Sequence, residues 1–493
     1  MRSIRGGHGR DQLHGRLCWY RSASTAIDQR EGNDYHAAMG FFPLINTIQH
    51  YPWGSTTGIP SLLGIENSGG SPMAELWMGT HPGGPSRVVV GAKSMPLGDL
   101  LQSDPANHLG PHVAERFAAE LPFLFKVLAA ERALSIQVHP SIEQAHAGYA
   151  REDSSGIAIS DPARNYKDRN HKPEVLCALT RFEGLGGFRD PQSISADFDE
   201  PEFAVEAAHP LRAALGGGGD RAAICRAFMH AMLSQGPRQT GELVSSALAL
   251  AARKLDGQPV EDDTPGAPFP SVLDSSPAIS PTPVSPTPGG SDCTARFRWI
   301  QRLALQYPGD IGVLSPLYLN HFALSPGQAV YLGAGTLHAY LRGVGVELMA
   351  ASDNVLRGGL TEKHIDRDEL LRIVDCGVTT VTMFDGCAHR QLRSRTDAPV
   401  GYSVLYPTPA TEFRLERIVL EGDDPVQVVR EPTAQIALCV GGRTRFLGNG
   451  EAHTISRGDA LFISGVHTEY SLSGPGELFL ASVPLEVLDG CPD

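Results

Sequence analysis

Two stretches in the second half of the chain decide the fold: LSPGQAVYLGAGTLHAYL, residues 324–341, and ISRGDALFISGVHTEYSL, residues 455–472. Each stretch holds a glycine turn, an alternating apolar strand, a second turn and a histidine. A repeat of this kind is typical of two β-barrels in which a turn and a strand deliver a histidine to the barrel interior. His338 in the first copy is a candidate metal ligand. His467 in the second copy has no companion set that resembles QVH or HKPE, so we expect its barrel to be structural.

The segments around the repeat differ in hydrophobic period. From Phe41 to about Arg189 short apolar runs alternate with Gly, Pro and Ser clusters, which indicates a β-rich domain. RAAICRAFMHAML and GELVSSALALAARKL, both between 190 and 305, instead place their apolar residues at helical spacing. We therefore predict a mainly β protein with an α-helical insertion, built as two cupin-type β-barrel (jelly-roll) domains plus a helical domain.

The same patterns predict the domain boundaries. The Pro, Ser and Thr content of residues 264–291 is too high for a segment that folds alone. The expected order is a disordered N-terminal extension (1–38), the first part of the catalytic barrel (39–190), the helical insertion with its 264–291 loop (191–310), the second part of the catalytic barrel (311–375), and a C-terminal barrel without metal (376–493).

Composition excludes several classes of function. At 493 residues the chain has room for roughly two to four domains. Its formal net charge of −14 argues against a general surface for nucleic acid or anionic membranes, and no apolar run reaches the length of about eighteen residues that predicts a membrane span. The eight cysteines include no CxxC pair, and the first 38 residues lack the apolar centre of a secretory signal. We expect a cytoplasmic protein that binds neither nucleic acid nor membranes.

Three polar segments contain a candidate metal site: SIQVHP (135–140), YKDRNHKPE (166–174) and GTLHAYL (335–341). SIQVHP reads as a strand, and residues two apart on a strand share a face, so Gln137 and His139 can reach one ion together. With Glu174 and His338 they make the mixed nitrogen and oxygen set of a catalytic divalent metal. The competing interpretation makes the histidines ordinary core residues and the glutamate a surface partner of a nearby cation.

The lysines point to an anionic substrate. Among the 41 Lys and Arg only six are lysines, and an arginine-rich chain is expected to keep lysine where a compact, flexible ammonium is needed. Arg357 is followed by two glycines, which let a ligand approach the backbone, although it could instead clamp Asp353. Four of the six lysines fall in the candidate site segments: Lys126, Lys167, Lys172 and Lys363.

These segments resemble the type I mannose-6-phosphate isomerases, the zinc-dependent phosphomannose isomerases of the cupin superfamily. The resemblance runs from about Pro43 to Asp366 with one interruption, and more faintly to the C-terminus. The segments that carry it are PLINTIQHYPWGS, AELWMGTHP, LSIQVHP, YKDRNHKPE and HAYLRGVGVELMAASDNVLRGGLTEK.

The resemblance implies an aldose-ketose isomerase that interconverts D-mannose 6-phosphate and D-fructose 6-phosphate through a metal-stabilised cis-enediolate, feeding mannose metabolism and GDP-mannose synthesis. It implies one Zn²⁺ per chain and a small-molecule sugar phosphate as the substrate, and we expect the protein to be a monomer. The implied residues are the ligands Gln137, His139, Glu174 and His338, the catalytic Arg357, and the substrate-binding Lys126, Lys172 and Ser135.

The proton-transferring base stays open among Glu347, His171 and a zinc-bound water, because matching of pKa values requires geometry. Tyr340 is a further near-site residue. The type of ligand alone does not separate zinc from manganese or iron. Two other classes of protein also stay open: a metal-dependent cupin such as an oxygenase or epimerase acting on another sugar phosphate, and a non-catalytic sugar-phosphate binding protein.

Overall fold

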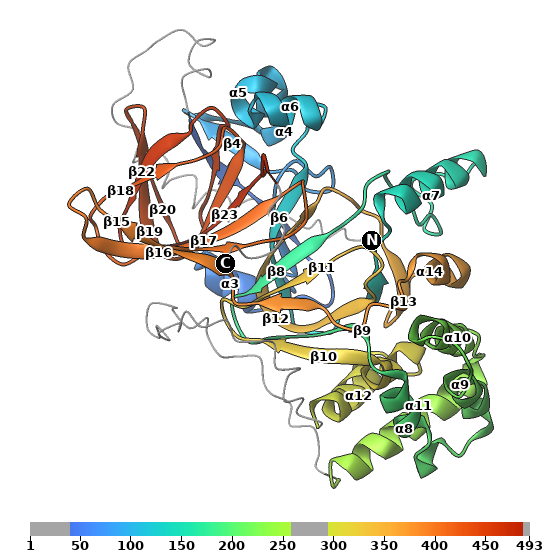
Figure 1. Cartoon of the computed structure of the whole chain (residues 1–493). Coiled ribbons are helices and arrows are strands. Elements are labelled where there is room, and N and C mark those ends of the chain that lie inside the picture. Colours follow the sequence, from blue (N-terminus) through green and yellow to red (C-terminus); the bar gives the residue numbers. More distant parts are fainter. Residues whose placement is uncertain (1–39, 258–293, 487–493) are drawn as a thin grey trace, which may run out of the picture.

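The computed structural model describes residues 40–257 and 294–486, so the N-terminal extension and the 264–291 loop that the sequence predicts lie outside it. Two large antiparallel sheets lie side by side, and a helical segment packs at the end of the molecule remote from the second sheet (Figure 1). The predicted fold class, mainly β with a helical segment, is confirmed.

The first sheet carries the candidate metal ligands. Within the described residues it has 11 strands in the order β14-β11-β8-β12-β6-β3-β2, with β9 and β7 also paired to β12. Its strands are β2 (Thr47–Gln49), β3 (Glu75–Met78), β6 (Phe123–Ala130), β7 (Ile136–Val138), β8 (Glu174–Ala178), β9 (Phe182–Phe188), β10 (Leu319–Leu324), β11 (Ala329–Leu332), β12 (His338–Ala350), β13 (Leu356–Gly359) and β14 (Thr382–Phe384).

The second sheet joins the C-terminal strands to three strands from the beginning of the chain. In the described part it has 12 strands, and its main order is β15-β16-β17-β23-β19-β21-β1-β4-β5. Its strands are β1 (Phe41–Ile45), β4 (Arg87–Val90), β5 (Lys93–Pro96), β15 (Cys387–Arg393), β16 (Pro399–Tyr406), β17 (Arg414–Leu420), β18 (Val426–Val429), β19 (Gln435–Gly448), β20 (Glu451–Ser456), β21 (Ala460–Ile463), β22 (Glu469–Ser473) and β23 (Gly476–Ser482).

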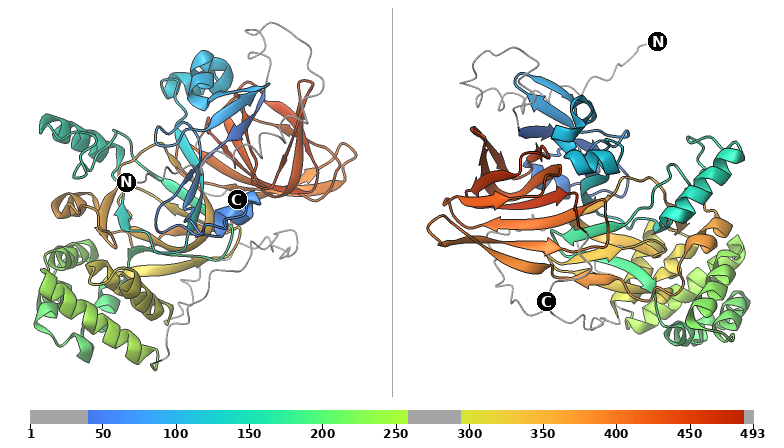
Figure 2. Two further views of the ribbon diagram at one scale, coloured as in Figure 1. Left: turned by 180° about the vertical axis from the view of Figure 1, so that it is seen from behind. Right: turned by 45° about the horizontal axis from the view of Figure 1, so that its top comes forward.

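The helical segment forms where the sequence changes period. Leu243, Ala247 and Leu250 are fully buried on one face of the longest of these helices, and Phe228 is buried on its neighbour. Figure 2 shows the segment from two further sides. Its elements are α8 (Pro191–Phe198), η1 (Pro201–Phe203), η2 (Glu206–Ala208), α9 (His209–Leu215), α10 (Arg221–Leu233), α11 (Pro237–Lys254), α12 (Ala295–Gln306), η4 (Ile311–Leu314) and α13 (Ser315–Tyr318).

Further helices of the described residues lie outside this segment, and the sequence pattern did not reveal them. Most are too short to show a period, and local signals start several of them. Ser141 caps α7 in a reciprocal capping box with Gln144, and prolines begin α5 and α6. The helices outside the helical segment are α3 (Gly58–Leu63), α4 (Leu97–Ser103), α5 (Pro105–Leu109), α6 (Pro111–Arg116), α7 (Ile142–Ser154) and α14 (Arg367–Ile373).

Two apolar clusters orient the first sheet. One lies between the sheets and includes Val127 and Val346 from the first and Ile436 and Phe479 from the second. The other joins the helical segment to apolar side chains of β7, β12 and β13. Because side chains alternate along a strand, the polar residues between those apolar ones face the opposite side, where the candidate site lies.

Candidate active site

Strand β7 lies between β12 and β13 and brings three predicted site residues together. Gln137 is directly opposite His338 of β12 on one side and Arg357 of β13 on the other. Its neighbours Ile136 and Val138 are fully buried in the cluster with the helical segment. Gln137 therefore faces away from that cluster, and it lines a pocket of about 570 Å³.

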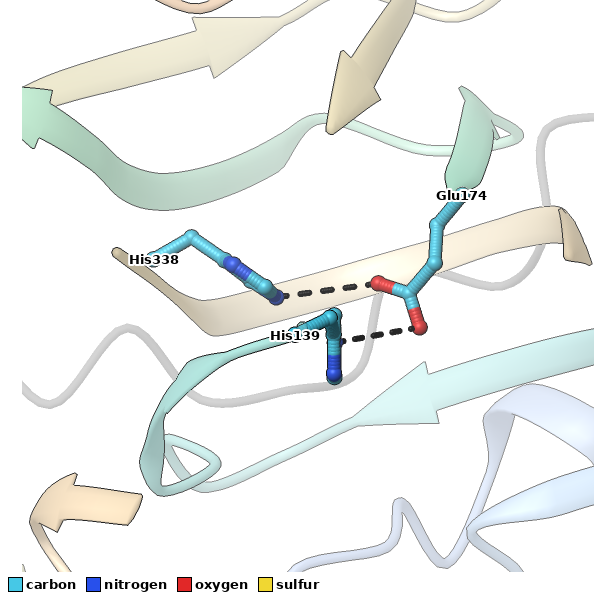
Figure 3. Close-up of side chains that lie close together, drawn as sticks. All are labelled: His139, Glu174 and His338. Carbon is cyan, nitrogen blue, oxygen red and sulfur yellow. Dashed lines mark ion pairs between the residues drawn. The ribbon is translucent and has the colours of Figure 1, made fainter. Parts of the chain in front are cut away.

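His139, Glu174 and His338 converge as a buried group that could hold a metal ion (Figure 3). Their side chains are at most 3% exposed. Glu174 Oε1 lies 3.6 Å from His139 Nε2, and Glu174 Oε2 lies 3.6 Å from His338 Nε2. The three ligand atoms lie within 4.8 Å of one another. His139 Nε2 is buried and has no hydrogen-bond partner among the described residues. A cation between these atoms would satisfy them all, so the donor set fits a divalent metal.

The backbone fixes both imidazole rings in the tautomer that a metal requires. His139 Nδ1 donates to the carbonyl oxygen of Asn354 at 2.8 Å, and His338 Nδ1 donates to that of Thr336 at 2.8 Å. A carbonyl oxygen only accepts, so each Nδ1 carries the proton and each Nε2 keeps its lone pair. Neither contact could be predicted from the sequence, because any residue supplies a backbone carbonyl.

The pKa shifts of His139 and Glu174 favour the deprotonated forms that bind a cation. Burial, helped by the charge of Lys172, lowers the pKa of His139 to about 4, so the ring is neutral at neutral pH. Burial alone would raise the pKa of Glu174, but Lys172 and the two histidines outweigh it and hold the pKa well below its usual range. Two neutral imidazoles and one carboxylate would leave a bound divalent ion with net positive charge.

A second buried group joins three strands of the first sheet. Lys126 Nζ lies 2.6 Å from Glu347 Oε2 and 3.1 Å from Glu75 Oε1, and Glu75 also accepts a hydrogen bond from Trp77 Nε1 at 2.8 Å. All three charged side chains are at most 8% exposed. Burial raises the pKa of Glu347, and Lys126 opposes that rise only in part. Glu75 was not among the predicted residues, although it belongs to the segment AELWMGTHP.

Two other predicted residues have carboxylate partners. Lys172 Nζ lies 2.7 Å from Glu174 Oε1, beside the metal group. His171 Nε2 lies 2.9 Å from Glu412 Oε1, which comes from the loop between β16 and β17 of the second sheet. A loop of the second sheet therefore contacts the segment that carries Lys172 and Glu174.

Arg357 and Lys363 line the same pocket with Ser135. Among the described residues neither cation forms an ion pair. Burial lowers the pKa of Arg357, and burial together with the charge of Arg357 lowers the pKa of Lys363. Arg357 is half-buried and Lys363 is exposed, and two neighbouring cations without a carboxylate partner are suited to an anionic ligand. Lys167 differs, because its ammonium donates to backbone carbonyls of residues 159 and 161.

Two antiparallel sheets with a buried His, Glu and His group in a pocket lined by cations are typical of a metal-dependent enzyme for an anionic substrate. Residues 41–191 match the model of the type I phosphomannose isomerase catalytic domain. The chain is 36% identical over 438 residues to mannose-6-phosphate isomerase of Escherichia coli (strain K12), covering 88% of this chain and 97% of that protein. It is 32% identical over 445 residues to the enzyme of Rattus norvegicus, covering 87% and 94%.

A solved crystal structure is also similar to this chain in fold and sequence. A crystal structure of mannose 6-phosphate isomerase in a zinc-bound holo form has a TM-score of 0.72 and 32% identity, covering 91% of this chain and all of that one. The chain belongs to the mannose-6-phosphate isomerase family, the type I phosphomannose isomerases. No helix of the described residues is long and apolar enough to cross a membrane.

Proposed function

We propose that the protein is a zinc-dependent isomerase that interconverts D-mannose 6-phosphate and D-fructose 6-phosphate. The observation that carries the proposal is the match to mannose-6-phosphate isomerases along nearly their whole length, in a chain whose pocket holds a buried metal-binding group. Zinc is supported by the zinc-bound relative and by a donor set of two imidazoles and a carboxylate.

We propose His139, Glu174 and His338 as zinc ligands, with Gln137 as the fourth. Gln137 qualifies because it is paired with His338 across the sheet and faces the pocket. When bound, zinc supplies a Lewis acid that stabilises negative charge on the adjacent oxygens of the enediolate. The protein's own contribution is to hold the ligand atoms in place through the carbonyls of Asn354 and Thr336.

The direction of β7 suggests how the substrate lies. Ser135 and His139 flank β7 on either side of Gln137, and because an extended chain rises about 3.3 Å per residue, they are at most roughly 13 Å apart. We propose that the sugar's C1 and C2 lie at the metal end and its phosphate at the end near Ser135. Lys363, which has no carboxylate partner among the described residues, is the cation we assign to the phosphate.

Lys126 and Lys172 are already neutralised by buried carboxylates, so we propose them as contacts for substrate oxygens close to the metal. Arg357 is opposite Gln137 and lies between the two ends of the pocket. We assign it to the negative charge that develops on the enediolate as the proton moves. This position makes Arg357 the proposed catalytic cation and Lys363 the binding cation.

We propose Glu347, rather than His171, as the group that moves the proton between C1 and C2. Glu347 lines the pocket, and burial raises the pKa of its carboxyl group, which makes the carboxylate a better proton acceptor. His171 is paired with Glu412. Turnover in D₂O, followed by NMR of the C1 and C2 hydrogens, tests this assignment: Glu347→Gln should abolish exchange and His171→Asn should retain it. The reverse result would transfer the role to His171.

The activity is tested by a coupled assay of the purified protein on mannose 6-phosphate. We expect turnover that chelation abolishes and zinc restores. Turnover that survives removal of all metal would contradict the metal assignment, and turnover of another sugar phosphate alone would contradict the substrate.

We further propose a cytoplasmic monomer. Cys177, Cys225, Cys376 and Cys439 are free and buried, as in proteins of a reducing compartment. Light scattering of the full chain at micromolar concentration should give the mass of one 52.7 kDa chain, and a doubled mass would contradict it.

A further inference from the structure

The turn that follows β13 connects Arg357 to Lys363, the two cations assigned to the substrate. Leu360, in the middle of this turn, has a φ of 54°, in the left-handed region that residues with a Cβ rarely adopt. Its side chain is 1% exposed and belongs to the apolar cluster of the helical segment. Leu360 and Thr361 also line the substrate pocket. An unfavourable backbone conformation at the pocket wall persists only where its surroundings enforce it.

Asp310, in the connection between α12 and η4, supplies the hydrogen bonds that hold this turn. Its Oδ1 accepts from the backbone N–H of Leu360 at 2.8 Å and of Gly312 at 2.7 Å, and its Oδ2 accepts from that of Thr361 at 3.2 Å. The carboxylate is thus bonded to two consecutive amides of the turn, which lies 50 residues further along the chain. Bonds from N–H groups to a carboxylate are among the stronger hydrogen bonds in proteins.

Two glycines allow this close approach. A Cβ added to Gly359 would lie 2.9 Å from Gly312 Cα and 3.1 Å from Asp310 Oδ1, and one added to Gly312 would lie 2.8 Å from Leu360 N. Gly359 also has a φ of 147°. The second glycine after Arg357 is therefore explained by the approach of another backbone segment, whereas the sequence pattern suggested the approach of a ligand.

We infer that Asp310 is a positioning residue for the isomerase reaction, which holds the 359–361 turn so that Lys363 faces the phosphate and Arg357 the reacting carbons. The inference rests on the proposed roles of these two cations. Without the carboxylate, the amides of Leu360 and Thr361 lose their acceptor, and the turn is free to leave the left-handed conformation. Lys363 lies beyond the turn, so substrate binding is affected more than the metal site.

The test compares Asp310→Ala and Asp310→Asn with the wild type. Asp310→Ala should raise KM for mannose 6-phosphate and Ki for inorganic phosphate at least about tenfold, the change expected for loss of outer contacts to a ligand-binding group. Its zinc content should stay that of the wild type. Backbone amide exchange should accelerate in the peptide that contains residues 357–363. Asp310→Asn, which keeps an oxygen acceptor, should recover most of the binding.

Asp220→Ala is the matched control, because Asp220 also accepts a backbone N–H, from Ala223 at 2.8 Å, but caps a helix outside the pocket. It should leave KM, Ki and the exchange of residues 357–363 unchanged. Unchanged KM and Ki in Asp310→Ala, or equal changes in both alanine variants, would overturn the inference. Lys363→Ala separates the proposed phosphate contact from the positioning role of Asp310. If Lys363→Ala leaves KM and Ki unchanged, the proposed phosphate contact is wrong. If Lys363→Ala changes them and Asp310→Ala does not, only the positioning role is wrong.

Discussion

Replacement of Lys126 with methionine should destabilise the protein, and the loss should grow with pH. Its Nζ lies 2.6 Å from Glu347 Oε2 and 3.1 Å from Glu75 Oε1. At an effective dielectric constant of about 20 these distances correspond to attractions of about 6 and about 5 kcal/mol. Repulsion between the carboxylates and desolvation of the ammonium offset much of this. Because loss of one partner of a buried pair costs about 3–5 kcal/mol, we expect that range at pH 8.

The pH dependence follows from the carboxyl groups that stay behind. Burial already raises the pKa of Glu347, and loss of the opposing Lys126 raises it further. A carboxyl group whose pKa is higher in the folded than in the unfolded protein contributes stability that is complete below the unfolded pKa, about 4.3. That stability is lost as pH rises through the folded pKa. The deficit of Lys126→Met should therefore be smaller at pH 5 than at pH 8.

Unfolding temperatures of metal-stripped wild type and Lys126→Met at the two pH values measure this difference. Lys93→Met is the control, because Lys93 is an exposed lysine of β5, and it should change neither value. Equal deficits of Lys126→Met at pH 5 and pH 8 would refute the reasoning, as would a variant as stable as the wild type.

Three further predictions concern the metal site, the cations and acid stability. His338→Ala should lose the metal, and elemental analysis that still finds about one zinc per chain would show that the ligand set is wrong. Arg357→Ala should lower kcat at least about 10²-fold with little change in KM, whereas Lys363→Ala should mainly raise KM. Steady-state kinetics measure both. A steep rise in KM at unchanged kcat for Arg357→Ala would show that the arginine binds the phosphate instead. For Glu183, burial opposes ionisation, but the contact with His321 and the hydrogen bonds from Trp299 and Arg181 outweigh it and lower the pKa to about 2 from an ordinary value of 4.5. It therefore contributes up to about 3 kcal/mol that is present above pH 4.5 and lost as pH falls toward 2, and acid unfolding of Glu183→Gln should lack this part of the slope.

Local pattern was sufficient to predict the β-rich first sheet, whereas the candidate metal group was predicted from local spacing together with the family resemblance. Alternation in SIQVHP placed Gln137 and His139 on one face, and in the structure Gln137 is paired with His338 across the sheet. The helical period predicted the buried faces of α10 and α11. In each case the prediction depends on residues within one strand or a few turns of one helix, where the direction of a side chain follows from its spacing along the sequence.

Contacts between distant segments could not be predicted in the same way. Glu75 reaches Lys126 because β3 is next to β6, and no local period encodes that neighbourhood. Glu412 reaches His171 from the other sheet. The carbonyl of Asn354 acts through the backbone, so residue type reveals nothing of its bond to His139. The roles of the site residues and the domain boundaries stay predictions.

The pairing of β1 with β21 has a consequence for how the protein is made. Phe41 is opposite Ile463, so the first described strand of the chain completes its sheet only with residues about 420 positions later. At about 5–20 residues per second a ribosome needs roughly 20 to 80 seconds to synthesise that interval. Throughout this time β1 lacks its partner β21, although it can already pair with β4, and the second sheet is completed only after β21 has been synthesised. We expect chaperones to shield this strand during translation, and the isolated fragment 376–493 to aggregate because it lacks β1 at the exposed edge of β21.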